Sequence, residues 1–211
     1  AMSGGWTPTI HLYSQAGGAL AFDDSSHSFV PDKCAQAVTV AGSANGAFSL
    51  KACLEQGFQQ GRHAAQAEAI NTMAPNTAAH KEDSASVGEQ AVASAEWPQE
   101  AMQPYWYIRN ANTEKQWLDF QYDVKVSDIE LAQRENFVSI EHVKRYTTNG
   151  MSIDQGKTSN MNTLAVMAEL SGRKIPEVGT TKFRPPYHPV TLGTFVGRDL
   201  GDQYAPRLEM P

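Results

Sequence analysis

The residues best suited to chemistry lie in one stretch, 141–160, where cations and hydroxyls flank a glycine turn. The candidates within it are Arg145, Thr147, Thr148, Lys157, Thr158 and Ser159. Such groups bind phosphate through charge-assisted hydrogen bonds, and the N-terminus of a helix beginning near Ser159 would add backbone N–H donors. The same residues also fit a solvated loop between two helices, so spacing alone leaves both interpretations open.

A glycine turn at 42–46 is the second candidate site. The sequence places it between a short apolar run, 37–41, which predicts a buried strand, and a helical pattern over 48–58. Backbone N–H groups in such a turn can approach an anion at the positive end of a helix. The spacing Gly42-x-x-x-Gly46 is not the GxGxxG dinucleotide fingerprint, so an ordinary strand-to-helix connection explains it as well.

No catalytic residue and no metal site is predicted. His142 and His188 have no partnered carboxylate nearby, which a general base requires. Cys34 and Cys53 match no metal-ligand spacing, and they suit two reduced thiols in a cytosolic protein. The Gly156-Lys157-Thr158 tripeptide lacks the first glycine of a P-loop, which argues against nucleoside triphosphate binding.

Composition narrows the possible partners. The 211 residues hold 17 Lys+Arg and 23 Asp+Glu, a formal net charge of −6, which disfavours a nucleic-acid partner. No apolar run approaches the roughly 20 residues that span a bilayer, and the first residues lack the pattern of a secretory signal. These features predict a cytoplasmic location without a membrane contact.

The elements that must position the candidates divide into segments. Residues 1–66 predict strands, among them 9–13, and one helix; residues 67–104 are rich in small and polar residues and predict a linker. Residues 105–197 predict a helical domain, with helices at about 127–136, 139–149, 158–171 and from Pro176, and then an extended Pro-rich tail. The fold class expected is therefore α+β.

Several motifs resemble the alpha subunit of heterotetrameric sarcosine oxidase. The resemblance is carried by residues 3–8, 40–46, 120–124, 141–151, 154–160 and 179–187. It covers nearly the whole chain apart from the linker, and the motifs at 141–160 and 179–187 are long and specific. It implies that residues 1–66 are the C-terminal part of a dinucleotide-binding domain, that 105–197 contact a flavin, and that 198–211 lead to a folate-binding domain. The chain then looks like an internal fragment.

The family resemblance also implies cofactors and partners. An alpha subunit binds NAD within a complex with beta, gamma and delta subunits, which oxidatively demethylates sarcosine to glycine. FMN lies at the alpha–beta interface, attached to beta, whereas FAD and tetrahydrofolate are bound outside this chain. The chain alone is expected to be inactive, because substrate oxidation would occur on the beta subunit.

The helical segment further resembles the small [2Fe-2S] domains of the bacterioferritin-associated ferredoxin type. Related dehydrogenases place cysteines at the positions of Asp119, Gln121, Asp154 and Ser159. None of these residues is Cys here, and clusters need thiolates, so the fold is expected without its metal.

Carried over residue by residue, the resemblance assigns one group of residues to NAD: Gly42, Ser43, Asn45, Gly46, Phe48 and Leu50. The candidates of the stretch 141–160, together with Arg184, are expected around FMN. The rival interpretation is a subunit-interaction module of a different secondary-amine oxidase or dehydrogenase, with residues 183–187 as an extended docking strip.

Overall fold

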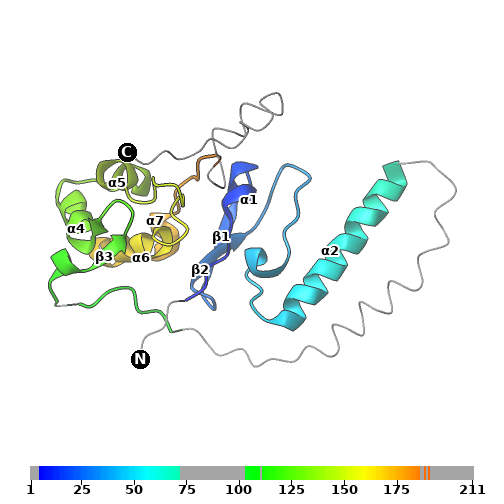
Figure 1. The fold of residues 1–211 in the computed structure, drawn as a ribbon, viewed down its shortest axis with the longest axis horizontal. Coiled ribbons are helices and arrows are strands. Elements are labelled where there is room, and N and C mark those ends of the chain that lie inside the picture. Colours follow the sequence, from blue (N-terminus) through cyan, green and yellow to red (C-terminus); the bar gives the residue numbers. More distant parts are fainter. Residues whose placement is uncertain (1–4, 72–102, 110, 186–187, 189, 191–211) are drawn as a thin grey trace, which may run out of the picture.

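The computed structural model describes residues 5–71, 103–109, 111–185, 188 and 190. Most of the predicted linker and all of the segment 198–211 lie outside the described residues, as do Pro186 and Tyr187. The described part combines helices with two separate two-stranded antiparallel sheets, so it is a mixed α and β structure (Figure 1).

The N-terminal part holds a short helix, a hairpin and a long helix. Helix α1 (His11–Gln15) precedes strands β1 (Leu20–Asp23) and β2 (Ser28–Pro31), which pair with each other. A 3-10 turn, η1 (Gly42–Asn45), then leads into α2 (Leu50–Asn71). Figure 1 shows α2 standing away from the helical part of the molecule, with η1 at its base.

The C-terminal part is a compact helical unit. The turn η3 (Thr113–Lys115) and the hairpin β3 (Trp117–Asp119) and β4 (Val124–Lys125) lead into α4 (Val126–Arg134). Helices α5 (Ile140–Thr147), α6 (Asn160–Ser171) and α7 (Ile175–Val178) follow. Helix α4 packs against both α5 and α6, and α6 packs against α7. The four predicted helices of this domain are thus present.

The two parts share one hydrophobic core. Val126, Ile129 and Val143 are fully buried at its centre, and the cluster continues into Ile10 and Phe29 of the N-terminal part. Because burial of apolar surface contributes about 25 cal/mol per Å², this shared cluster fixes α1 and the β1–β2 hairpin against the helical unit.

Two predicted strands are wrong. Residues 11–13 lie in α1, and both Tyr13 and Ile10, the residue before the helix, are buried. Residues 37–41 form no strand and are not buried. A strand exists through hydrogen bonds to a neighbouring strand, and among the described residues none pairs with this run. The apolar residues of this run therefore indicate β propensity, which is not sufficient to form a strand.

Helix ends were predicted with mixed accuracy. Helix α6 ends at Gly172, whose φ of 65° is the left-handed conformation expected of a C-terminal glycine. Helix α5 ends earlier than expected, at a left-handed Thr148. Helix α4 begins at Val126, close to the predicted start at 127, and Asp128 caps it by accepting the backbone N–H of Lys125 at 2.8 Å.

Candidate anion-binding site

The last turn of α5 presents cations to one side of the molecule. Ile140 and Val143 face the core, while Glu141, Lys144 and Arg145 face an extended segment that we call the strap, residues 180–185. Positive side chains at the C-terminal end of a helix interact favourably with its dipole. The dipole of α5 therefore favours the positive charges of Lys144 and Arg145 in its last turn.

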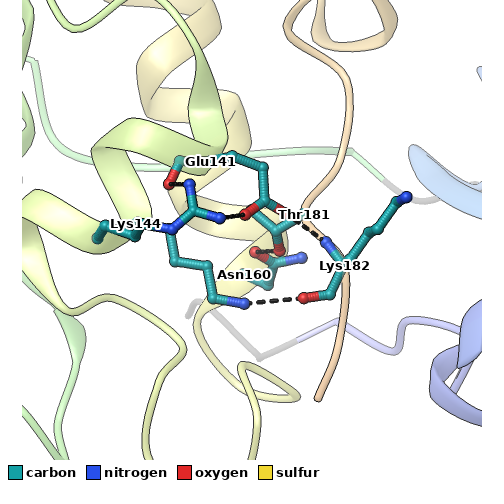
Figure 2. Close-up of polar contacts among 6 residues, drawn as sticks. Glu141, Lys144, Asn160, Thr181 and Lys182 are labelled. Carbon is teal, nitrogen blue, oxygen red and sulfur yellow. Dashed lines mark hydrogen bonds and ion pairs between the residues drawn. The ribbon is translucent and has the colours of Figure 1, made fainter.

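Two side chains of α5 hold the strap by its backbone (Figure 2). The carboxylate of Glu141 accepts the backbone N–H of Lys182 at 2.7 Å, and the ammonium of Lys144 donates to the Lys182 carbonyl at 3.0 Å. Figure 2 also shows the Lys182 side chain extending away from both partners. The hydroxyl of Thr181, the residue before Lys182, donates to the side-chain oxygen of Asn160 in α6 at 3.0 Å.

These contacts fix the strap so that its side chains alternate, as they do in an extended segment. Phe183 points inward and is buried, whereas Arg184 points outward. The backbone N–H of Arg184 donates to the side-chain oxygen of Gln155 at 3.0 Å. The guanidinium of Arg184 is thereby brought to the same side as the cations of α5.

A cavity of about 80 Å³ lies at this junction, and we call it the cation cavity. It is lined by Glu141, Lys144, Arg145, Met151, Gln155 and Arg184. Glu141 is committed to Lys182 and to Arg145, whose guanidinium lies 3.3 Å from its carboxylate. Burial lowers the pKa of Lys144, and Arg184 and Arg145 lower it further against the opposing effect of Glu141. An anion in the cavity would relieve this repulsion.

The structure places the predicted phosphate residues in different settings. Arg145 and Arg184 meet at the cation cavity, although they lie 39 positions apart in the sequence. Lys157 lies elsewhere, at a second cavity of about 70 Å³ between the N-terminal part and α6. Lys144 was not among the candidate residues, although it directly precedes the candidate Arg145 in the sequence, and this could have indicated it.

The predicted hydroxyls bind within the chain. Thr147 donates to the Val143 carbonyl at 2.8 Å, and Thr148 donates to the Thr147 carbonyl at 2.5 Å. Thr158 donates to the carboxylate of Asp154 at 2.8 Å, and the hydroxyl of the buried Ser159 lies 3.5 Å from the carboxylate of Asp119. A phosphate bound by these groups would have to compete with existing partners.

Two carboxylates organise the loop that carries these hydroxyls. The buried Asp119 accepts the backbone N–H groups of Gln121 and Tyr122 on one oxygen and that of Gly150, at 2.8 Å, on the other. Burial raises the pKa of Asp154, but hydrogen bonds from Thr158, Ser152 and Gly156 outweigh it, and the pKa is lowered.

All four positions at which the resemblance implies cysteines in related dehydrogenases take part in these hydrogen bonds: Asp119, Gln121, Asp154 and Ser159. Asp119 and Ser159 face one another directly. Among the described residues no group of three or more His, Cys, Asp or Glu side chains is placed to hold a metal ion.

The predicted NAD residues surround η1 and the start of α2. Gly42 and Gly46 have left-handed φ angles of 70° and 80°, so the turn requires its glycines. The backbone N–H of Gly42 donates to Gln56 of α2 at 3.0 Å, and Asn45 donates to the same oxygen. Ser43 and Leu50 are exposed, and Phe48 is half-buried. The N–H of Gly42 is therefore not available to a ligand in this conformation.

No helix among the described residues has both the length and the apolar character needed to cross a bilayer.

Known proteins resemble this chain over its whole length. Residues 113–198 match the family model of the sarcosine oxidase A3 domain. The chain is 37% identical over 215 aligned residues to the sarcosine oxidase subunit alpha of Rhizobium meliloti (strain 1021), covering 100% of this chain and 20% of that protein. It is 33% identical to the subunit alpha of Corynebacterium sp. (strain P-1), with 98% and 20% covered.

A solved structure has the same fold. L-proline dehydrogenase from P. horikoshii superposes with a TM-score of 0.65 at 22% identity, over 89% of this chain and 37% of the other. At this identity the likeness concerns the fold. The chain spans about one fifth of the length of the relatives named above, and by sequence it belongs to the sarcosine oxidase alpha subunit family.

Proposed function

We propose that this chain is the part of a sarcosine oxidase alpha subunit that holds the phosphate of FMN at a contact with the beta subunit. The observation that carries the proposal is the meeting of Lys144, Arg145 and Arg184 around one cavity. A phosphate group carries close to two negative charges, and guanidinium groups bind it through paired charge-assisted hydrogen bonds.

The residues present fit that ligand. Three cations line the cavity, and the single carboxylate there is already bound to Arg145 and to the strap backbone. Met151 lies at the same cavity and is 44% exposed, which offers an apolar surface beside the charges. FMN supplies the redox chemistry when it is bound, and the role of this chain is to bind and orient its phosphate.

The wider activity follows from the same proposal. The assembled enzyme, with beta, gamma and delta subunits, would oxidatively demethylate sarcosine to glycine, with FAD and tetrahydrofolate bound outside this chain. The relatives are named as subunits of sarcosine oxidase, which supports an oxidoreductase that acts as an assembly. No residue of this chain is assigned a proton transfer or a nucleophilic attack.

Removal of the Arg184 side chain tests the phosphate site. In Arg184→Ala, assembly should need an FMN concentration about tenfold higher or more for the same FMN incorporation, because a charge-assisted hydrogen bond contributes roughly 1.5–3 kcal/mol to binding before FMN is attached. The measurement is the ratio of FMN to protein when the subunits assemble at limiting FMN.

Lys182→Ala is the matched control, since it removes a cation from the same strap whose side chain extends away from Glu141 and Lys144 (Figure 2). It should retain FMN at the wild-type level. Equal losses in the two variants would indicate a general charge effect, and an unchanged FMN ratio in Arg184→Ala would refute the site.

We further propose that NAD lies along η1 and the start of α2, against Gly42, Ser43, Asn45, Gly46, Phe48 and Leu50. The support is a glycine turn that leads to the N-terminus of a helix of 22 residues, with an exposed Ser43 at the turn. The N–H groups of Gly42, Gly46 and Ala47 are bonded within the chain, so other N–H groups of the turn would have to bind the pyrophosphate.

A charge at Ser43 tests this second site. Ser43→Asp should weaken NAD binding at least tenfold, because the new carboxylate would repel the pyrophosphate, whereas the neutral Ser43→Asn should change it little. Calorimetric titration of NAD into the assembled oxidase measures both. If the two variants bind NAD alike, NAD does not lie on this turn.

The rival docking role of residues 183–187 has less support. Phe183 is only 7% exposed and belongs to the shared core, so its side chain is committed inside the molecule. Pro186 and Tyr187 lie outside the described residues.

A further inference from the structure

The strap separates two cavities, and the wall between them includes a residue from the N-terminal part. Phe183 lines the cavity of about 70 Å³ next to α1, and Arg184 lines the cation cavity on the other side. His11 of α1 lines the first cavity, and Gln155 lines the second. These two residues contact each other through the wall.

His11 is held by the strap and by the loop before α6. Its ring packs on the ring of Phe183, with centroids 3.7 Å apart and planes inclined by 32°. Its Nε2 lies 3.0 Å from the backbone carbonyl of Gln155. A carbonyl only accepts hydrogen bonds, so Nε2 carries a proton and donates it. The side chain is 4% exposed and therefore has little freedom to move.

Gln155 transmits this contact to the cation cavity. Its backbone has a φ of 53°, an unfavourable conformation for a non-glycine residue that surrounding contacts must maintain. Its side-chain oxygen accepts the N–H of Arg184 at 3.0 Å, and its side-chain nitrogen donates to the Ser152 carbonyl at 2.9 Å. The backbone of Gln155 is thus fixed by His11, and its side chain fixes the backbone of Arg184.

His11 reaches Arg184 by a second route. Phe183 precedes Arg184 directly in the strap, so the packing of the imidazole on Phe183 limits rotation of the strap about its own axis. Rotation would turn Arg184 away from Lys144 and Arg145. Both routes start from one side chain of α1.

We propose that His11 is a positioning residue that orients Arg184 into the cation cavity, acting through Gln155 and Phe183. This inference rests on the proposed phosphate site. It gives the N-terminal part a role in anion binding at the cation cavity, on the other side of the strap from His11. The residues of the stretch 141–160 alone do not indicate this role.

The role of His11 is geometric and not one of charge. Burial lowers the pKa of His11, and Lys157 and Lys144 lower it further, against the opposing effects of the Gln155 hydrogen bond and Asp154. The imidazole is accordingly neutral at neutral pH and adds no cation to the site. Its replacement should affect anion binding only through the placement of Arg184.

Inorganic phosphate is the probe for the test, because the cation cavity lies wholly within this chain. Phosphate is titrated into the 211-residue chain and followed by NMR chemical shifts. His11→Leu removes the hydrogen bond and the ring, and it should weaken phosphate binding about tenfold. His11→Gln places an amide N–H near the position of Nε2, and it should recover binding to within about threefold of the wild type.

Leu12→Ala is the matched control in the same helix, since Leu12 is 59% exposed, and it should leave binding unchanged. In an Arg184→Ala background, His11→Leu should cause no additional loss, because its effect passes through Arg184. A full additional loss in that background, or wild-type affinity in a folded His11→Leu variant, would overturn the inference.

Gln155→Asn gives an independent measurement if His11→Leu does not fold. Asn accepts the left-handed conformation, but its side chain is one methylene shorter and does not reach the Arg184 N–H. It should weaken phosphate binding by a similar factor, and wild-type affinity would again overturn the inference. If Arg184→Ala itself has no effect, the phosphate site is wrong; if only the His11 and Gln155 variants have none, the positioning role alone fails.

Discussion

At the scale of single residues, Asp119 shows how a small domain holds its loops together through one carboxylate. It is 2% exposed, and it joins the turn of the β3–β4 hairpin to Gly150 and to Ser159 at the start of α6. Bonds to an ionised acceptor are stronger than neutral ones, so one side chain can order several backbone segments. The loop that carries Gln155 and Lys157 depends on this anchor.

Asp119→Asn should therefore destabilise the chain by about 2–3 kcal/mol. The amide has only one oxygen, so its NH₂ group would face backbone N–H donors that the second carboxylate oxygen now accepts, and those donors would lose their partner. The exposed Asp123, which accepts the indole N–H of Trp117, is the control. Its left-handed φ of 55° suits Asn as well, so Asp123→Asn should change stability by less than about 0.5 kcal/mol. Urea unfolding measures both, and equal midpoints would contradict the anchoring role.

Sequence patterns predicted the residue types of the candidate site but not the partners of each side chain. Arg145 and Arg184 were chosen by residue type and expected together around FMN, whereas Lys144 was not chosen. The hydroxyls of Thr147, Thr158 and Ser159 satisfy local groups instead, because a short polar side chain next to a helix end finds a backbone or carboxylate partner first. His11 carried no signal, since its partners are Phe183 and Gln155, far along the chain.

At the scale of elements, the helices were predictable and the strands were not. Helix α6 has its start and its end in local residues, Ser159 and Gly172, so sequence alone is sufficient. The run 37–41 has strand composition, but pairing is a property of two segments, and none of the described residues supplies the second. Residues 9–13 alternate like a strand, yet α1 forms because Ile10 and Tyr13 are buried together.

The strap illustrates how an element without internal hydrogen bonds is positioned. Residues 181–184 form hydrogen bonds with three other segments of the chain. The partners are Glu141 and Lys144 of α5, Gln155 of the following loop, and Asn160 of α6. An extended segment has no bonds of its own along its length, so neighbours must satisfy its backbone groups. The backbone of Arg184 is consequently held by Gln155, although the next residue is a proline.

At the scale of the whole molecule, the shared core decides whether the N-terminal and helical parts behave as one unit. Ile10 and Phe29 enter the same cluster as Leu164 and Phe183, and His11 adds a polar bridge. Helix α2 differs, because only η1 packs closely on it among the described elements (Figure 1). The proposed phosphate site therefore depends on both parts. The proposed NAD site lies on η1 and the start of α2, which have fewer packing contacts with the rest of the described structure.

Ile10→Ala tests this dependence directly. Ile10 is 7% exposed, and truncation of a buried Ile costs about 2–5 kcal/mol through lost apolar contacts and the cavity left behind. We expect calorimetry to show one unfolding transition for the hairpin and the helical unit in the wild type, and a separate, lower transition for the N-terminal part in the variant. The exposed Leu12→Ala should keep the wild-type profile. If Ile10→Ala unfolds in one step at an unchanged temperature, the two parts are not coupled through this core, and His11 could not transmit order from α1 to Arg184.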